Sequence, residues 1–552
     1  MIRLGGLKKE LNLSLTFLYK FKGLIINYIK MSRISSTLFL ILLVFSSCGH
    51  NLRGLSQSKE RQRSAGILMH ITSLPSNYGI GTLGLEAYRF ADFLVKAKQK
   101  NWQMLPLGPT GYGDSPYQST SSYAGNPYMI DLDTLIAEKL LTKEEVTSVF
   151  WGSDETKVDF GNMFKERYPV LEKAFKRFKT NTDYDFFVKE NKDWLEDYAL
   201  FMSLKEHFGN VQWTEWPEDI KLRKPATLEK CRKDLAKKIN FHKFIQYKFY
   251  EQFNKLKNYC HKMGLKLIGD VPIYVPLDSS DVWANPKIFQ LNDKLTPLAV
   301  AGVPPDAFTA DGQLWGNPLY DWDKMAKDNY KWFINRLRAT GKLFDVIRID
   351  HFRGLESYWS VPYGDTTARN GHWVKGPDMG LIKAIHKDLP NLDFIAEDLG
   401  YLTPEVLALR EGSGFPGMKV LEFAFDTREK SDYLPHTYNK NTVCYAGTHD
   451  NEVLVQWEKD IPPQDRNLAE RYLGIPMGAD LRYPILRAGM ASVSYLFVAQ
   501  LQDYLGLGGE SRMNRPGIMD GKNWLWRAKH DQINDKLAED IAYLTNLYAR
   551  CD

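Results

Sequence analysis

The sequence predicts an α/β fold, a (β/α)8 TIM barrel with inserted, largely helical subdomains. Three observations support this prediction. Eight apolar runs of strand length recur after residue 64, and most are followed by helix-like patterns, which indicates a parallel sheet covered on both faces. Eight is the number of strands that closes a β/α barrel. No internal repeat, low-complexity tract or long Pro/Gly/Ser linker divides this part of the 552-residue chain, so a string of small domains is not expected.

The predicted strands are unevenly spaced. They cover residues 66–71, 102–107, 265–275, 344–351, 393–399, 418–423, 442–447 and 493–501. The last run, within 491–505, is equally compatible with a helix, because periodicity alone does not type a short apolar run. The connection between the second and third strands is far longer than a normal loop, which predicts a helical insert at about 135–262.

The last predicted helix of this insert, 234–262, has an apolar face. Helical spacing relates six of its residues, which are Phe241, Phe244, Ile245, Lys248, Phe249 and Phe253. Burial in the core is the expected explanation of this pattern, and an amphipathic helix on a membrane surface is the alternative.

The net positive charge is confined to the beginning of the chain. The formal net charge is +5, but residues 1–63 carry eleven Lys and Arg against two acids, a net +9, so residues 64–552 have a net charge of −4. A mildly acidic body offers no electrostatic attraction for a polyanion. We therefore expect no nucleic-acid partner.

Residues 1–63 are predicted to be a leader outside the folded enzyme, which would occupy 64–552. A basic start at Met31, an apolar run at 38–45 and small residues before Cys48 resemble a bacterial lipoprotein export signal. A misplaced upstream start, an organelle transit peptide and a disordered tail are alternatives. The other cysteines are scattered, which weakly favours a reducing compartment. We expect a cytoplasmic protein, with a lipid-anchored envelope protein or a plastid protein as alternatives, and a membrane partner only if the leader is a lipoprotein signal.

A glycine-rich segment, Gly79-Ile-Gly81-Thr-Leu-Gly84, matches the GxGxxG pattern of dinucleotide-binding proteins. It does not follow a strand directly, and the next predicted strand ends without the acidic residue that would bind a ribose. A loop near the barrel mouth is the better interpretation. No Cys/His spacing suggests a metal site, and no cofactor is expected.

Acidic residues follow three of the predicted strands. Asp350 ends the fourth strand, Glu397 and Asp398 end the fifth, and Asp450 follows the seventh. In a barrel, these C-terminal strand ends form the mouth where active sites lie. Arg348 and Asp350 are two residues apart, so both side chains point to the barrel interior, where Arg348 would keep Asp350 ionised. Taken singly, each acid also has a structural explanation: an ion pair, a helix cap or a turn.

Two carboxyl groups that flank a scissile bond, one ionised and one protonated, are the minimal set for glycosidic chemistry. The aromatic content of 13% agrees with a sugar substrate, since several aromatic residues lie in Gly/Pro-rich loops. These include Tyr112, Tyr117, Trp315, Trp524 and Trp526. For each of them, core packing is an equally good explanation.

Several segments together resemble the 4-α-glucanotransferases (amylomaltases or disproportionating enzymes) of glycoside hydrolase family 77. The catalytic motifs of that family are similar to Arg348-Ile-Asp350-His351-Phe-Arg353-Gly, Ala396-Glu397-Asp398-Leu-Gly400 and Gly447-Thr448-His449-Asp450-Asn451. Other matches include Asp114-Ser-Pro-Tyr117, Gly269-Asp270-Val-Pro272, Trp315-Gly-Asn317-Pro and Arg512-Met-Asn514-Arg-Pro516. The resemblance covers about residues 64–530.

The resemblance implies retaining transfer of α-1,4-glucan segments from a donor maltooligosaccharide to the 4-hydroxyl of an acceptor glucan or glucose. It implies Asp350 as nucleophile, Glu397 as general acid/base and Asp450 as transition-state stabiliser. The substrate-binding residues that it implies are Tyr117, Asp270, Trp315, Asn317, Arg348, His351 and His449. The expected partners are α-1,4-glucans and maltooligosaccharides.

The resemblance also places the loop 301–308 over the cleft, where its apolar residues would exclude water. Two other functions remain open. One is an α-glucan hydrolase of the α-amylase clan, and the other is a non-catalytic glucan-binding surface protein.

Overall fold

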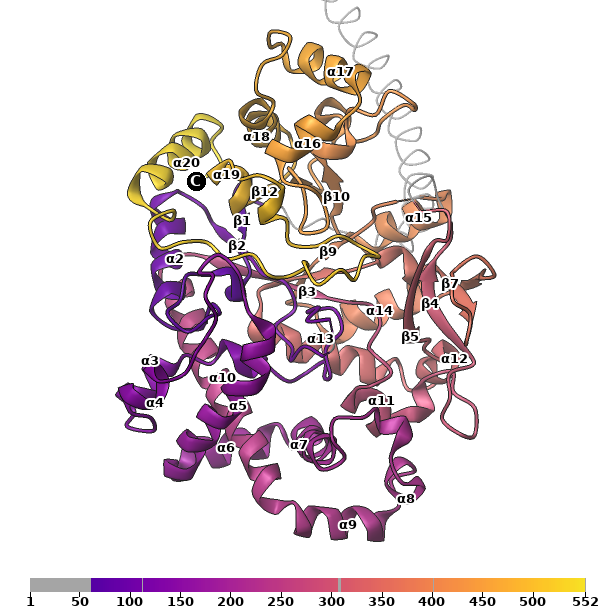
Figure 1. Cartoon of the computed structure of the whole chain (residues 1–552). Helices are drawn as coiled ribbons and strands as arrows, with labels where there is room; N and C mark the ends of the chain where they lie inside the picture. Colours follow the sequence, from indigo (N-terminus) through magenta and orange to yellow (C-terminus); the bar gives the residue numbers. More distant parts are fainter. Residues whose placement is uncertain (1–60, 112, 306–308, 401, 552) are drawn as a thin grey trace, which may run out of the picture. The chain divides into compact units, whose positions relative to one another are not determined.

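The computed structural model describes residues 61–111, 113–305, 309–400 and 402–551. Most of the leader, including Cys48, lies outside these residues, as do Tyr112 and residues 306–308. Glu60–Glu411 and Phe415–Asp552 form one compact unit. Its centre is a closed barrel of parallel strands (Figure 1). Around the barrel the strands follow the order β1-β12-β11-β10-β9-β6-β3-β2. The predicted (β/α)8 barrel is therefore confirmed.

All eight predicted strands belong to the barrel. Their bounds are β1 Ser64–Leu68, β2 Asn101–Gln103, β3 Lys266–Val271, β6 Val346–Ile349, β9 Asp393–Ala396, β10 Gly417–Val420, β11 Thr442–Tyr445 and β12 Leu496–Gln500. Most are shorter than the apolar runs that predicted them, because the last residues of each run leave the ladder and form the loops of the mouth. The ambiguous run at 491–505 contains both β12 and the short helix α19 (Leu501–Leu505).

Helices connect the strands on the outside of the barrel. Besides α19, the α-helices that the structure describes outside the β2–β3 connection are α2 (Leu85–Lys96), α11 (Ser280–Ala284), α12 (Trp322–Ala326), α13 (Lys331–Leu343), α14 (Asp378–Asp388), α15 (Pro404–Ser413), α16 (Leu454–Asp460), α17 (Pro463–Leu473), α18 (Arg482–Ala491) and α20 (Asp535–Leu547). Register pairs β1 with β12 from Ser64↔Leu496 to Leu68↔Gln500, and this pairing of distant strands closes the barrel.

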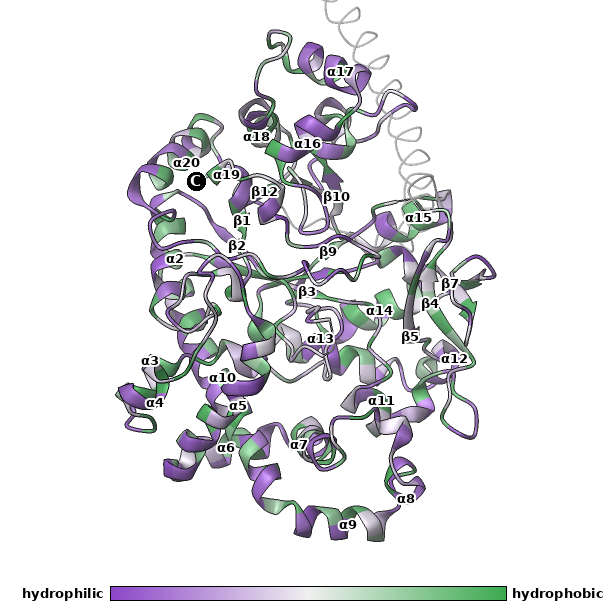
Figure 2. Cartoon of the chain, viewed as in Figure 1, coloured by the Kyte–Doolittle hydropathy of each residue, from purple (hydrophilic) through white to green (hydrophobic). Residues whose placement is uncertain are grey.

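The long connection between β2 and β3 is helical. It contains α3 (Leu132–Ala137), α4 (Lys143–Thr147), α5 (Phe160–Arg177), α6 (Thr182–Glu190), α7 (Lys192–His207), α8 (Glu218–Lys221), α9 (Pro225–Asp234) and α10 (Ala236–Lys262). The apolar face of α10 is buried: Phe244, Phe249 and Phe253 have no exposed surface. Core packing therefore explains the pattern that also suggested a membrane-surface helix. In the described part of the chain, no helix combines the length and apolar character needed to cross a bilayer (Figure 2).

Two other connections build a small antiparallel sheet that the sequence did not predict. Its order is β5-β4-β7-β8, from β4 (Ala299–Val303), β5 (Gln313–Pro318), β7 (Ser357–Pro362) and β8 (His372–Lys375). β4 and β5 precede β6, and β7 and β8 follow it. Because the pairing joins two separate insertions, such as Ala301 with Ser360, no local pattern reveals it. The insertions are therefore less helical than expected.

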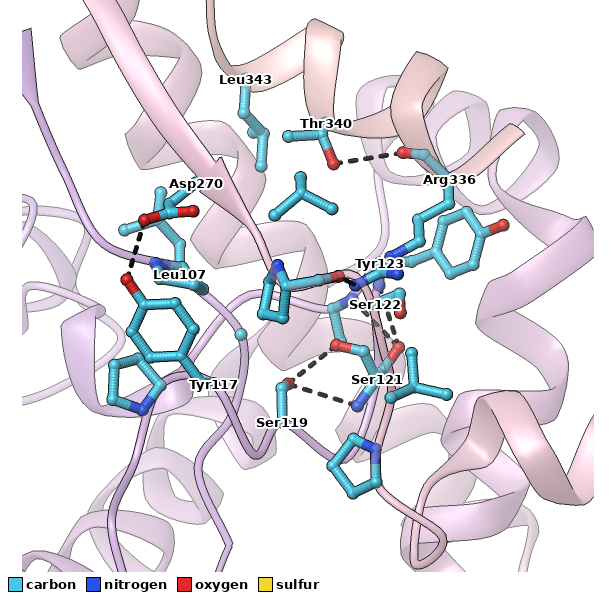
Figure 3. Close-up of a pocket in the computed structure, with 18 of the residues that line it drawn as sticks. Leu107, Tyr117, Ser119, Ser121, Ser122, Tyr123, Asp270, Arg336, Thr340 and Leu343 are labelled. Carbon is cyan, nitrogen blue, oxygen red and sulfur yellow. Dashed lines mark hydrogen bonds between the residues drawn. The ribbon is translucent and has the colours of Figure 1, made fainter. Parts of the chain in front are cut away.

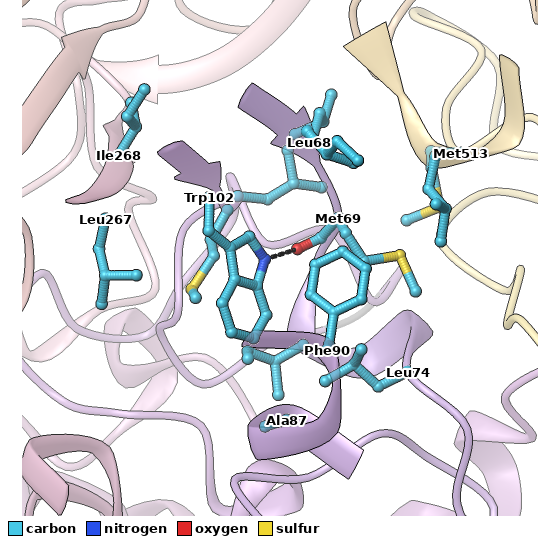
Figure 4. Packing of buried hydrophobic residues seen from close by; sticks show 14 of the residues in the cluster. Leu68, Met69, Leu74, Ala87, Phe90, Trp102, Leu267, Ile268 and Met513 are labelled. Atoms are coloured by element: carbon cyan, nitrogen blue, oxygen red, sulfur yellow. Dashed lines mark hydrogen bonds between the residues drawn. The ribbon is translucent and has the colours of Figure 1, made fainter. Parts of the chain in front are cut away.

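The N-terminal part of the barrel packs around a buried tryptophan. Trp102 of β2 has no exposed surface, and its indole N–H donates to the Met69 carbonyl at 2.7 Å (Figure 4). Phe90 of α2 meets its ring edge to face, with centroids 4.9 Å apart. Such pairs bury a large apolar area and still satisfy the polar indole nitrogen. This contact fixes α2 against β1 and β2.

The GxGxxG segment has a packing role. A Cβ on Gly81 would lie 1.8 Å from the Ile71 carbonyl oxygen, and one on Gly84 would lie 2.1 Å from Asp131 Oδ2. Gly84 is the N-cap residue of α2. These glycines therefore permit close backbone contacts at the start of a helix, which agrees with the loop interpretation.

Candidate active site

Asp270, Arg348, Asp350 and Glu397 lie at the C-terminal ends of barrel strands. Asp270 of β3 is paired in register with Arg348 of β6. Ile349 is paired with Ala396 of β9, so Asp350 and Glu397 follow neighbouring strands directly. The Asp350 N–H donates to the Val271 carbonyl at 3.0 Å, and the Glu397 N–H to the Ile349 carbonyl at 3.1 Å. The backbone ladder thus places these side chains together.

Arg348 bridges two carboxylates. Its Nη1 donates to Asp270 Oδ2 at 2.6 Å and to Asp350 Oδ1 at 2.8 Å. The Arg348 side chain is 3% exposed, whereas that of Asp350 is 26% exposed. A buried guanidinium between two acids is a charge-assisted pair with a rigid geometry. The ion pair expected from the i, i+2 spacing is present, and it leaves Asp350 accessible from the mouth.

Glu397 is held by backbone groups. Its Oε2 accepts from the His351 N–H at 2.6 Å, and its Oε1 accepts from the Leu399 N–H at 3.0 Å. Burial raises the pKa of Glu397 to about 8, with Arg348 opposing the shift and Asp350 adding to it. Glu397 is therefore mostly protonated at neutral pH, next to a carboxylate that is paired with an arginine. This is the arrangement required of a general acid.

Asp450 lies on the loop after β11 and is the most exposed of the three acids, at 40% of its side chain. Its Oδ1 accepts from Asn514 Nδ2 at 2.6 Å and lies 3.3 Å from His449 Nε2. Burial lowers the pKa of His449, with Asp450 opposing the shift. A neutral imidazole beside the carboxylate orients it without neutralising it.

Aromatic rings border the carboxylates. Tyr117 stacks on His449 with ring centroids 5.1 Å apart and an interplanar angle of 13°, and its hydroxyl donates to Asp270 Oδ2 at 2.8 Å. Trp315, which lies in the small sheet, packs against His351 in a T-shaped arrangement with ring centroids 4.8 Å apart. Both rings therefore come from insertions outside the barrel strands. Asn317 of β5 is 5% exposed and accepts from Gln118 at 3.3 Å.

Asp270 differs from the other predicted site residues because its side chain has no exposed surface. Its Oδ2 accepts from Tyr117 and Arg348, and its buried Oδ1 has no hydrogen-bond partner among the described residues. It is one of the residues that line a cavity of about 70 Å³, together with Ser119, Ser121 and Thr340 (Figure 3). Burial raises the pKa of Asp270 to about 7, with Arg348 opposing the shift. In this structure, Asp270 accepts from Arg348 and its side chain is not accessible to solvent.

Asp398, His351 and the loop 301–308 complete the set of segments named from the sequence. Asp398 points away from the mouth, where it accepts from the Met418 N–H at 2.7 Å and from Arg410 at 3.0 Å. His351 adopts a left-handed backbone conformation with φ of 52°. Burial lowers the pKa of His351 to about 3, with Arg353 adding to the shift. The tip of the loop 301–308 lies outside the described residues, so its overhang stays a prediction.

The sequence assigned no function to two residues that lie at the site, Asn514 and Arg512. Asn514 contacts the Asp450 carboxylate, and Arg512 Nη2 donates to the Asp450 carbonyl at 2.8 Å. Both lie on the loop after α19, more than ten residues past the end of β12, so no strand end marks them. The only signal in the sequence was their place in a family-like motif.

A family model and two relatives of known sequence carry the same description. A model of glycoside hydrolase family 77, described as 4-alpha-glucanotransferase, matches residues 69–532. A 4-alpha-glucanotransferase from Clostridium butyricum is 47% identical over 488 residues, which are 88% of this chain and 100% of that protein. A chloroplastic/amyloplastic 4-alpha-glucanotransferase from Arabidopsis thaliana is 38% identical over 501 residues, which are 89% of this chain and 86% of that protein.

Solved structures show the same relationship. An amylomaltase from Streptococcus agalactiae in complex with acarbose superposes with a TM-score of 0.86 at 42% identity, and the match covers 89% of this chain and 100% of that one. An amylomaltase from Corynebacterium glutamicum, at 16% identity and a TM-score of 0.71, shows the shared fold.

Proposed function

The chain belongs to the 4-alpha-glucanotransferases of glycoside hydrolase family 77, and we propose that Asp350, Glu397 and Asp450 carry out its reaction. It is a retaining enzyme that transfers α-1,4-glucan segments from a donor maltooligosaccharide to the 4-hydroxyl of an acceptor glucan or glucose. The family match does not favour the hydrolase or the non-catalytic glucan-binding protein. The observation that best supports the proposal is the geometry of two acids that follow neighbouring strands, with Asp350 bound by Arg348 and Glu397 bound by two backbone N–H groups.

In the first half-reaction, Glu397 donates its proton to the glycosidic oxygen while Asp350 attacks the anomeric carbon. The leaving glucan departs with that proton, and Asp350 forms a covalent glucosyl ester. Arg348 holds Asp350 in the orientation for attack, because its Nη1 donates to Oδ1 of that carboxylate. Asp450 stabilises the positive charge that develops on the sugar ring.

In the second half-reaction, Glu397 is ionised and removes a proton from the 4-hydroxyl of the acceptor. The acceptor oxygen displaces Asp350, which restores the carboxylate and the protonated Glu397. The stereochemistry is retained because each half-reaction inverts the anomeric carbon. Transfer dominates over hydrolysis only where an acceptor outcompetes water. Tyr117, Trp315 and the loop 301–308 are our candidates for excluding water and binding both glucans.

Of the predicted substrate-binding residues, Tyr117, Trp315, His351 and His449 border the carboxylates, and we retain them with Asn317 as candidates. Arg348 and Asp270 are assigned a different role. Their side chains are 3% and 0% exposed, so we propose that they orient Asp350 and contact no sugar hydroxyl directly.

The test uses maltotriose. The wild-type enzyme should produce glucose together with oligosaccharides longer than maltotriose, whereas a hydrolase would produce only shorter products. Asp350→Asn and Glu397→Gln should each lower the transfer rate at least about 10³-fold, because each removes one of two groups that act together. Glu411→Gln is a matched control, since that side chain is 73% exposed. Near-wild-type transfer by Asp350→Asn would refute the assignment.

We also propose that the enzyme acts in the cytoplasm. In the described part of the chain, Cys231, Cys260 and Cys444 are free thiols, which is typical of a reducing compartment. Mass spectrometry of the N-terminus of the mature protein tests this directly. A mature chain that begins at a lipid-modified Cys48 would contradict the proposal and place the enzyme at the cell envelope.

A further inference from the structure

Asp450 is carried by a loop, and a loop has to be held in place if a carboxylate is to act at a fixed point. Besides Asn514 and His449 at its carboxylate, the backbone of Asp450 has two contacts. Its N–H donates to Thr448 Oγ1 at 3.3 Å, and its carbonyl accepts from Arg512 Nη2 at 2.8 Å. Catalytic groups need positions defined to about 0.5 Å, which isolated loops rarely provide. The hydrogen bond from Arg512 to the Asp450 carbonyl is therefore a candidate for holding this loop in place.

Arg512 uses three nitrogens of its guanidinium on three different acceptors. Nε donates to the Asn514 carbonyl at 2.8 Å, Nη1 to Glu452 Oε2 at 2.9 Å, and Nη2 to the Asp450 carbonyl. The first acceptor lies on its own loop, and the other two lie on the loop after β11. A planar fork holds all three acceptors in one plane, which an ammonium group does not do. Arg512 thus fastens the two loops that carry Asn514 and Asp450.

The acids around Arg512 strengthen this arrangement. Glu422, which follows β10, is buried, and its Oε1 has no hydrogen-bond partner in the part of the chain that the structure describes. Asp503 of α19 is 1% exposed. Burial holds the pKa of Glu422 well above its usual range, with Asp503 and Glu452 adding to the shift and Arg512 opposing it. Without the guanidinium, Glu452 would lose its ion pair at 2.9 Å and the Asp450 carbonyl would lose its donor. The loop after β11 would then lose both of its attachments to Arg512.

We propose that Arg512 is a positioning residue for Asp450, acting through the clamp that it forms with Glu452 and the backbone of residues 450 and 514. This inference rests on the proposed role of Asp450. Arg512 itself touches no reacting atom. Its contribution is to keep the Asp450 carboxylate where positive charge develops on the sugar ring, so its loss should affect the transition state more than the bound substrate.

The experiment compares Arg512→Lys with Arg482→Lys in maltotriose disproportionation by the full chain. Arg482 is the matched control, because its Nη1 also binds two backbone carbonyls, at 3.1 and 3.3 Å, but both belong to α19 and not to the loop after β11. Arg512→Lys should lower kcat at least about tenfold and leave KM within about twofold, as expected for a misplaced catalytic group. Arg482→Lys should keep kcat within about twofold of wild type.

A double-mutant cycle separates positioning from general destabilisation. In an Asp450→Asn background, Arg512→Lys should reduce kcat by less than about twofold further, because the group that it positions is already disabled. Losses that multiply in the double mutant would overturn the inference, as would a kcat for Arg512→Lys equal to that of wild type. Should Arg512→Lys fail to fold, Glu452→Gln replaces it, and a kcat loss that vanishes beside Asp450→Asn is again expected. An active Asp450→Asn enzyme would instead refute the proposed role of Asp450.

Discussion

Replacement of Glu397 by glutamine should make the stability of the protein less dependent on pH. The pKa of Glu397 is about 8 in the folded protein against an ordinary value of 4.5, so the folded protein keeps a proton that the unfolded chain loses. The stability contributed by this proton is complete below about pH 4.5 and is lost as the pH rises towards 8. The slope is at most about 1.4 kcal/mol per pH unit, and the total is between about 2 and 5 kcal/mol.

Glutamine has no proton to lose, so Glu397→Gln should lack this slope. It should also have a constant penalty of about 1–3 kcal/mol, since its amide N–H₂ would face one of the two N–H groups of His351 and Leu399 that the carboxylate binds. Thermal unfolding of both proteins at pH 5, 6, 7 and 8 measures the difference. Relative to wild type, the variant should gain stability steadily across this range. Parallel curves for the two proteins would refute the reasoning, and Glu411→Gln, an exposed glutamate, should give such a parallel curve.

Three further results are expected. Because Glu397 has to be protonated in the first half-reaction, kcat/KM for maltotriose should fall about tenfold per pH unit above about pH 8. A pH profile of kcat/KM that is flat to about pH 10 would contradict the role of Glu397 as the acid. Tyr117→Phe keeps the ring stacked on His449 but removes the 2.8 Å hydrogen bond to Asp270, so kcat/KM should drop about tenfold. An unchanged kcat/KM would show that this hydrogen bond does not help Asp270 to hold Arg348. Gly269→Ala should lower stability by about 1–3 kcal/mol in denaturant unfolding, because its Cβ would lie 2.1 Å from the ring of Phe344, and unaltered stability would show that this ring moves freely.

Local patterns in the sequence were sufficient to predict the barrel fold. A strand buried on both faces has to be apolar along its whole length, so each of the eight runs carries its own signal, and the number of runs implies closure. The same local logic applies to Arg348 and Asp350, because residues two apart in a strand point to one side, and their ion pair is present at 2.8 Å. The strand bounds were less well predicted, since the residues that form the mouth loops are as apolar as the strands that precede them.

Only the tertiary structure decided which distant groups meet. Arg348 binds Asp270 from a strand 78 positions earlier, and Asn514 binds Asp450 across 64 positions. The small sheet likewise pairs β4 with β7, which are separated in the sequence by the barrel strand β6. Contacts of this kind arise because the closing barrel brings all C-terminal strand ends to one rim, and no periodicity within a single segment encodes them. The sequence by itself therefore determined the scaffold and predicted which three acids react, whereas the closed barrel decided which groups hold those acids and, through burial, raised the pKa of Glu397.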